Sequence, residues 1–313
     1  MSDLFEAQDE VTQNECDAYA RSLAKSSVTP LPWQGFHSYT LLSASGIIVQ
    51  FRSEASPLDN STVKIAKSIH PYLTPTTTYH GSMPNSSVTV WVMDALPGIG
   101  FLFTVSSITP AKQDITITDL AKFYAESWEN AQAPVEDKNH LYNTKLEQLR
   151  YALPTRFTPI IERIQSQIVH VVDQVPWVLT HQDLSNTNIL VGPDSGHLTG
   201  VVDWADAAIE PFGIALWGLE SILGCSGPGG WSYFLDDSSH SRTLFRQAFL
   251  AEIGAPLSDQ ICKAIDELRN LGILLRYGFT WESGVEEPVN DVSQLDMFLG
   301  SELFQTNTEL GLY

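Results

Sequence analysis

Residues 177–204 read WVLTHQDLSNTNILVGPDSGHLTGVVDW. The stretch opens on an apolar run, and two further short strands are expected at 188–191 and 198–202. The turn between them is rich in glycine, proline and aspartate, so the pattern predicts a β-hairpin. Three side chains with ligand-type oxygens lie at the base of this hairpin, namely Asp183, Asn188 and Asp203. Because Asp and Asn are scarce inside strands, an Asp that ends a Val-Val run suits a site better than a core.

Phosphoryl transfer from ATP requires these residue types. Mg²⁺ takes hard oxygen ligands, usually one or two carboxylates together with phosphate oxygens. A separate carboxylate must orient the acceptor hydroxyl and receive its proton. We therefore assign Asp183 as the catalytic base and Asn188 and Asp203 as magnesium ligands. The alternative interpretation is an Asx-rich turn that only caps a hairpin, and His181 is expected to be a structural histidine bonded to the backbone.

The segments HQDLSNTN and VVDW resemble the catalytic and magnesium segments of the aminoglycoside phosphotransferase family, which is close to choline kinases and more distant from protein kinases. The tryptophan after Asp203, where a protein kinase has D-F-G, favours the small-molecule branch. Residues 90–98, VWVMDALPG, resemble the hinge strand of the family. Residues 275–281, LRYGFTW, and 295–299, LDMFL, are similar to the tail of fungal members.

This resemblance implies an α+β, bilobal protein-kinase-like fold, with a small antiparallel-sheet N-lobe and a larger, mostly helical C-lobe. Residues 1–97 would form the nucleotide-binding lobe with the hinge, and residues 98–313 the catalytic and substrate-binding lobe. The cofactors would be ATP and Mg²⁺, and the hinge backbone around Asp94 and Leu96 would pair with adenine. The hydrophobic periodicity agrees with this order of elements. It predicts strands at 36–42, 47–52 and 87–94, and helices at 62–69, 119–130, 141–153, 157–169, 241–253, 259–277 and 291–304.

The small lobe departs from the family pattern. On the strand IIVQFR, residues 47–52, the residue that aligns best with the family cation is the neutral Gln50. Arg52 lies one pleat further on the same face; it either supplies the positive charge or is an exposed residue without a role. The helix that follows contains no acid, so the usual lysine–glutamate clamp cannot be formed. The phosphate-covering turn has a single glycine, Gly35, so backbone amides and the Ser38 hydroxyl would have to bind phosphate.

Two functions remain open. The first is an ATP- and magnesium-dependent kinase that phosphorylates a hydroxyl of a small molecule, and the second is a weak or inactive pseudokinase that binds a nucleotide or metabolite. The pseudokinase is suggested by Gln50, by the acid-free helix and by Ala215, which is near the position where many relatives have an aspartate that braces the catalytic loop.

The glycine-rich segment 224–230 is expected to be a flexible loop. Five acids expected in loops could bind amino groups of an acceptor, namely Asp236, Asp237, Glu282, Glu286 and Glu287.

The amino-acid composition limits the classes of molecule that are expected to bind this protein. The 313 residues carry a formal net charge of −20, which disfavours nucleic acid and anionic membranes as partners but would tolerate or attract a cationic small molecule. Three cysteines without metal-type spacing fit a reducing cytosol. No apolar run approaches membrane-spanning length, and the acidic N-terminal segment lacks the pattern of a signal peptide, so we expect a cytoplasmic protein.

Overall fold

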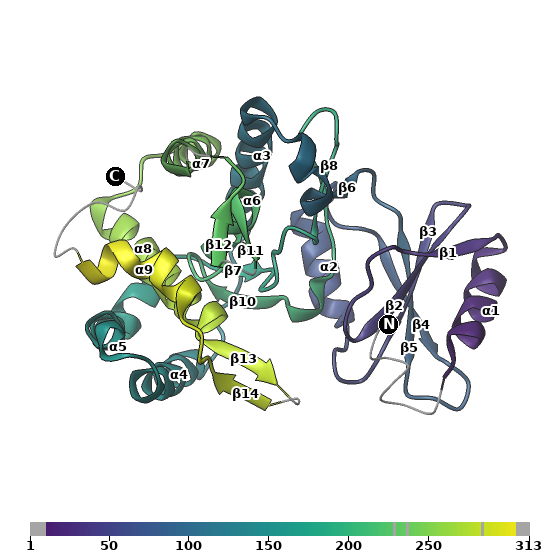
Figure 1. The fold of residues 1–313 in the computed structure, drawn as a ribbon, viewed down its shortest axis with the longest axis horizontal. Coiled ribbons are helices and arrows are strands. Elements are labelled where there is room, and N and C mark those ends of the chain that lie inside the picture. Colours follow the sequence, from purple (N-terminus) through teal and green to yellow (C-terminus); the bar gives the residue numbers. More distant parts are fainter. Residues whose placement is uncertain (1–10, 228–229, 236–237, 283–284, 305–313) are drawn as a thin grey trace.

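A computed structural model describes residues 11–227, 230–235, 238–282 and 285–304, and it divides into two lobes (Figure 1). The small lobe is built on a five-stranded antiparallel sheet with the order β1-β2-β3-β5-β4. Its strands are β1 (Val28–Pro30), β2 (Ser38–Ser43), β3 (Ile47–Arg52), β4 (Thr77–Ser82) and β5 (Thr89–Asp94). Helix α1 (Gln13–Ala24) packs on one side of this sheet at the outer end of the molecule (Figure 1).

The alternation along β3 decides which side of the sheet faces the rest of the protein. Val49 and Phe51 are fully buried in a small core with Cys16 and Ala20 of α1. The opposite face carries Gln50 and Arg52, as the sequence predicts for a strand whose apolar face must pack. The sheet therefore directs the polar residues of β3 toward the large lobe.

Helix α2 (Asn60–Ile69) joins the small lobe to the large one. Asp59 begins it as the N-cap, because its carboxylate accepts a hydrogen bond from the Thr62 backbone N–H at 2.7 Å. The next residue after the helix, His70, is completely buried and bonds to Glu126 at 2.8 Å and to Ser127 at 3.1 Å. The apolar face of α2 belongs to the core of the large lobe, so this helix is anchored there through histidine instead of through an acid of its own.

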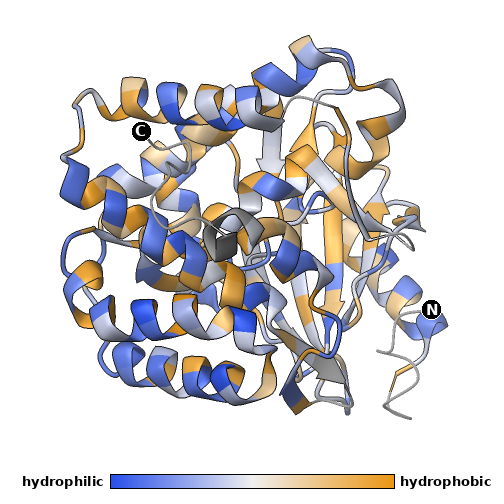
Figure 2. Cartoon of the chain, turned by 60° about the vertical axis from the view of Figure 1, so that its left-hand side comes forward, coloured by the Kyte–Doolittle hydropathy of each residue, from blue (hydrophilic) through white to orange (hydrophobic). Residues whose placement is uncertain are grey.

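The large lobe is mostly helical, with short antiparallel pairs of strands between its helices (Figure 1). Its helices are α3 (Pro110–Glu129), α4 (Lys138–Ala152), α5 (Thr158–Val172), α6 (Glu220–Leu223), α7 (Ser238–Ile253), α8 (Asp259–Tyr277) and α9 (Ser293–Phe304). Its strands are β6 (Ile99–Gly100), β7 (Trp177–Thr180), β8 (Ile189–Val191), β9 (Leu198–Val201), β10 (Ala208–Pro211), β11 (Gly224–Gly227), β12 (Gly230–Tyr233), β13 (Phe279–Glu282) and β14 (Val285–Pro288). Hydrophilic and hydrophobic residues alternate along the outer helices, as is typical of helices with one buried face (Figure 2).

The expected α+β fold with a small antiparallel sheet and a larger helical lobe is confirmed. The predicted hairpin around residue 195 forms as β8 and β9, and the predicted helix at 259–277 is α8. Two predictions were wrong. Residues 224–227 and 230–233 pair as the hairpin β11–β12 instead of forming a loop, and Glu282, Glu286 and Glu287 lie in the paired strands β13 and β14. No helix within the described residues is long and apolar enough to cross a membrane.

The buried His70 makes stability depend on pH. Burial lowers the pKa of His70 below its ordinary value of 6.5, and the neighbouring Glu126 opposes this effect without overcoming it. The folded state therefore holds a neutral imidazole that the unfolded chain would protonate. The stability contributed by this site is present above about pH 6.5 and is lost as the pH falls below it.

We predict that His70→Gln lowers the free energy of unfolding at pH 7.5 by about 1–3 kcal/mol, because two buried hydrogen bonds are disturbed. Denaturant unfolding should show a smaller difference from the wild type at pH 5.5. His80→Gln, at an exposed position of β4, is the control and should change little at either pH. A loss for His70→Gln that grows toward low pH would contradict the assignment.

Candidate active site

Two loops of the large lobe are tied together at the end that faces the small lobe. The first, after β7, carries Asp183 and Asn188, and the second, after β9, carries Asp203. The Asn188 amide nitrogen donates to the Asp183 backbone oxygen at 2.9 Å and to its carboxylate Oδ2 at 3.0 Å. The backbone N–H of Val202 donates to the Asn188 carbonyl at 3.0 Å. The structure thus brings together the three residues that the sequence analysis selected.

His181 joins the same two loops. Its Nε2 lies 2.9 Å from the carbonyl oxygen of Val202, and the side chain is buried against Trp204. Burial lowers the pKa of His181, which keeps the imidazole neutral, so Nε2 carries the proton that it donates to the carbonyl. This geometry agrees with the structural role expected for the histidine.

Two residues of these loops adopt left-handed backbone angles. Gln182 has a φ of 60° and Asp203 a φ of 64°, a region that residues other than glycine seldom occupy. Such strain persists where the surrounding contacts overdetermine it, and it concentrates at functional sites. Here it turns the side chain of Asp203 out of the end of β9, toward the small lobe.

Arg52 of the small lobe contacts Asp203 directly. Its Nη1 lies 2.8 Å from Asp203 Oδ1, although the two residues are 151 positions apart in the sequence. The same nitrogen donates to Gln50 at 3.0 Å, while Nε and Nη2 donate to the backbone and hydroxyl oxygens of Ser56 at 2.9 and 2.7 Å. Only 2% of Arg52 is exposed. The arginine is therefore fixed between the lobes, and Gln50 helps to orient it.

A second arginine lies on the other side of the site. Arg276, in the last turn of α8, places Nη2 at 2.8 Å from Asp183 Oδ1, and its guanidinium lies 4.9 Å from the centre of the Trp217 ring. Burial raises the pKa of Asp183, the charge of Arg276 lowers it, and the nearby charge of Asp203 raises it again. The net shift is upward, so this carboxylate accepts a proton more readily than an ordinary aspartate does.

Asn188 and Asp203 each have one side-chain oxygen that makes no hydrogen bond to another described residue, and these two oxygens could bind a magnesium ion. Because Asn188 uses its amide nitrogen on Asp183, its Oδ1 remains available, and so does Oδ2 of Asp203, whose other oxygen binds Arg52. Within the described ranges there is no group of three or more His, Cys, Asp or Glu that could hold a metal alone. One amide oxygen and one carboxylate fit a Mg²⁺ whose remaining ligands are phosphate oxygens and water.

The other predicted nucleotide-binding residues lie on the small lobe and at its junction with the large lobe. Ser38 of β2 lies directly opposite Arg52 of β3, so both side chains lie on the face of the sheet that is turned toward the large lobe. The Ser38 hydroxyl lies close to Gly35. Asp94 is exposed at the end of β5, and the side chain of Leu96 packs over β9 against Gly200. These positions are compatible with nucleotide contacts, which remain predictions.

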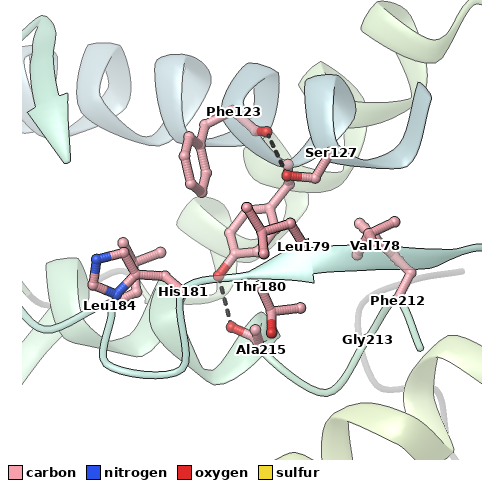
Figure 3. A pocket seen from close by; sticks show the side chains of 11 residues that line it. Phe123, Ser127, Val178, Leu179, Thr180, His181, Leu184, Phe212, Gly213 and Ala215 are labelled. Atoms are coloured by element: carbon pink, nitrogen blue, oxygen red, sulfur yellow. Dashed lines mark hydrogen bonds between the residues drawn. The ribbon is translucent and has the colours of Figure 1, made fainter. Parts of the chain in front are cut away.

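The loop that carries Asp183 is supported by packing around Ala215. Ala215 is buried, and its carbonyl accepts a hydrogen bond from the Tyr124 hydroxyl at 2.6 Å (Figure 3). Leu184, the residue after Asp183, is 1% exposed and packs in the same place, beside a void of about 10 Å³. The buried side chain of Leu184 therefore supports the loop, although position 215 is an alanine and not an aspartate.

A cavity of about 550 Å³, within the size range of small-molecule sites, is lined by Gln182 and by Arg276, the partner of Asp183. Most of the residues that line the cavity were not predicted from the sequence, among them Tyr142, Asp206, Glu210, Trp217, Arg276 and Phe279. The second acid in DWAD, residues 203–206, was the one local signal that could have been used. Of the acids predicted to contact an acceptor, Glu286 lines the cavity, whereas Asp236 and Asp237 lie outside the described residues.

Comparison with known proteins agrees with this geometry. Residues 101–225, which include the whole 177–204 stretch, match the model of the phosphotransferase enzyme family. A GDP complex of a mutant aminoglycoside 2'-phosphotransferase superposes with a TM-score of 0.54 at 18% identity, covering 87% of this chain and 86% of that one. The macrolide 2'-phosphotransferase of Brachybacterium faecium gives a TM-score of 0.52 at 15% identity, covering 84% and 92%.

An ADP-bound aminoglycoside phosphotransferase gives a TM-score of 0.50 at 18% identity, covering 96% of this chain and all of that one. The comparison with curated proteins gives no match. At these identities the solved structures establish the kinase-like fold. Together with the family model, they confirm the resemblance to aminoglycoside phosphotransferases.

We predict that Arg52→Gln lowers the free energy of unfolding by about 2–4 kcal/mol, because buried hydrogen-bond partners and the Asp203 carboxylate lose their donor. Arg150→Gln is the control, since it breaks ion pairs of α4 that are much more exposed. Denaturant unfolding of both variants measures the difference. Equal losses would show that the contact between Arg52 and Asp203 does not hold the lobes together.

Proposed function

We propose that this protein is an ATP- and magnesium-dependent phosphotransferase that phosphorylates a hydroxyl group of a small molecule. The observation that carries the proposal is the position of Asp183, whose carboxylate is bonded to Asn188 through Oδ2 and, through Oδ1, to Arg276, which lines the 550 Å³ cavity. A phosphate donor bound between the lobes and an alcohol in the cavity would meet at this carboxylate. The experiment is detection of ADP release together with a phosphorylated product by mass spectrometry.

Asp183 acts as the base in this proposal. Its raised pKa favours acceptance of the proton that the acceptor hydroxyl loses as the phosphoryl group is transferred. The hydrogen bonds from Asn188 and Arg276 fix its two oxygens, so the carboxylate does not have to be ordered when the acceptor arrives. Activity should fall as the pH decreases through this raised pKa, because the protonated form cannot serve as base.

Asn188 and Asp203 would hold the metal, which would neutralise charge on the phosphates of the bound nucleotide. Arg52 keeps Asp203 in place from the small lobe. The phosphates would lie against the inner face of β2 and β3 and the loop around Gly35, with the hinge near Asp94 and Leu96 contacting the base. Structurally similar proteins have been solved with GDP and with ADP, which supports a nucleotide as phosphate donor without selecting between ATP and GTP.

The alternative function is a pseudokinase that binds a nucleotide or metabolite without transferring phosphate. The observation that favours it is that Arg52 is already bonded to Gln50, Ser56 and Asp203 and so has little capacity left for a phosphate. Asp203 is also the carboxylate that would bind magnesium. Calorimetry with Mg-ATP, followed by ADP release over a broad panel of alcohols, separates the two. Binding without release favours the pseudokinase. The soluble, cytoplasmic location expected from the sequence applies to both.

We predict that Asp183→Asn reduces kcat by roughly 10² or more and leaves Mg-ADP affinity nearly unchanged, because a general base acts mainly in the transition state. The acid limb of the pH–rate profile should disappear with it. Asp194→Asn, in the exposed turn between β8 and β9, is the matched control. Turnover that survives Asp183→Asn would remove this residue from the mechanism.

For Asp203→Asn we expect a different pattern. The amide keeps the shape of the side chain but loses the charge that attracts the metal, so Mg-ADP affinity should fall by roughly tenfold or more. The affinity for ADP in EDTA should change little. Isothermal titration calorimetry under both conditions gives the comparison, and an equal loss with and without magnesium would show that Asp203 binds the nucleotide or supports the fold instead of holding a metal.

A further inference from the structure

The acids that line the cavity are mostly neutralised by the protein itself. Glu210 is buried, and its carboxylate binds Lys138 Nζ at 2.5 Å and the hydroxyl of Tyr142. Glu286 binds Lys145 Nζ at 2.7 Å. These two acids already have cationic partners, so neither offers a free charge to a ligand.

Asp206 is the third acid of the cavity lining. It lines the cavity, and its carboxylate has no hydrogen bond or ion pair with any other described residue. The cation nearest to the catalytic carboxylate, Arg276, is engaged with Asp183 and lies over Trp217. Of the three acids that line the cavity, Asp206 is therefore the one that has no bonded partner among the described residues and is available to a ligand.

Part of the remaining wall is apolar and aromatic, and polar side chains such as His37, Ser56 and Gln182 line the rest. Trp217 and Phe279 are nearly buried, and their exposed edges line the cavity together with Leu141 and Leu275. The ammonium group of Lys145 lies 5.3 Å from the centre of the Phe279 ring, which holds the Lys145–Glu286 pair against the aromatic wall. Such surfaces bind apolar or aromatic groups, and a single carboxylate gives orientation.

We propose, on the basis of the function proposed above, that the acceptor is a hydroxylated small molecule with an apolar or aromatic face and at most one amino group. A polycation would have to displace Lys138 from the buried Glu210 or Lys145 from Glu286. Displacing Lys138 would leave a largely buried charge without its partner, which is strongly unfavourable, and displacing Lys145 would break a partly exposed ion pair at a smaller cost. The internal ion pairs therefore make binding of polyamines less favourable, whereas they do not oppose acceptors with less charge.

The test uses the full chain saturated with Mg-ADP and calorimetry with three probes: phenyl β-D-glucoside, which is neutral and aromatic, glucosamine, which has one amino group, and kanamycin, which has several. We expect phenyl glucoside to bind at least about tenfold more tightly than kanamycin, which is roughly 1.4 kcal/mol. Equal or tighter binding of kanamycin overturns the inference, and so does a lack of binding by all three probes.

Two further variants locate the binding site. Lys145→Met releases Glu286 and should strengthen kanamycin binding by at least about threefold, the effect of roughly one exposed charge pair. Leu141→Arg, at a half-exposed position of the cavity wall, should weaken phenyl glucoside binding. Val169→Arg, on the exposed face of α5, is its control. Kanamycin binding that is unchanged in Lys145→Met, or phenyl glucoside binding that is unchanged in Leu141→Arg, contradicts the inference.

Failure of this inference is distinguishable from failure of the proposed function. Mg-ADP binding is measured before the probes are added. If Mg-ADP does not bind, the proposed phosphotransferase is wrong. If Mg-ADP binds and kanamycin is the preferred probe, the phosphotransferase stands and only the acceptor class is wrong.

Discussion

The ion pair between Arg52 and Asp203 is the contact on which the site depends. It joins the inner face of the small-lobe sheet to the loop after β9, and it lies where water has little access on the arginine side. Kinases of the usual pattern place a lysine on this strand and tie it to a glutamate of the following helix. Here the helix has no acid, and the cation is held by Gln50 and Ser56 while it contacts Asp203, the proposed metal ligand.

Opposing charges around Asp183 set its chemistry. Asp203 and burial raise its pKa, and Arg276 limits this rise, so the carboxylate remains a usable base beside a second acid. Arg276 also rests on Trp217, which forms part of the acceptor cavity. One side chain therefore contacts both Asp183 and the cavity wall, and it would couple the shape of the proposed acceptor cavity to the orientation of the proposed base.

The catalytic segment was predictable because its information is local. The five-residue spacing from Asp183 to Asn188 and the hairpin that returns to Asp203 bring three residues together within 21 positions. Alternation along β3 predicted that Gln50 and Arg52 face the cleft, but it could not tell which of them contacts Asp203. The cavity could not be predicted, because Tyr142, Glu210 and Arg276 come from separate segments that only tertiary packing places together. Helix α1 and the β13–β14 hairpin were not predicted.

Anomalous diffraction from crystals grown with Mn²⁺ and a non-hydrolysable ATP analogue tests the central claim most directly. The account predicts a manganese peak about 2.1 Å from the side-chain oxygens of Asn188 and Asp203, with the terminal phosphate of the analogue directed at Asp183. A nucleotide bound between the lobes without metal at these two residues, or a metal bound elsewhere while Asp203 contacts only Arg52, would contradict it.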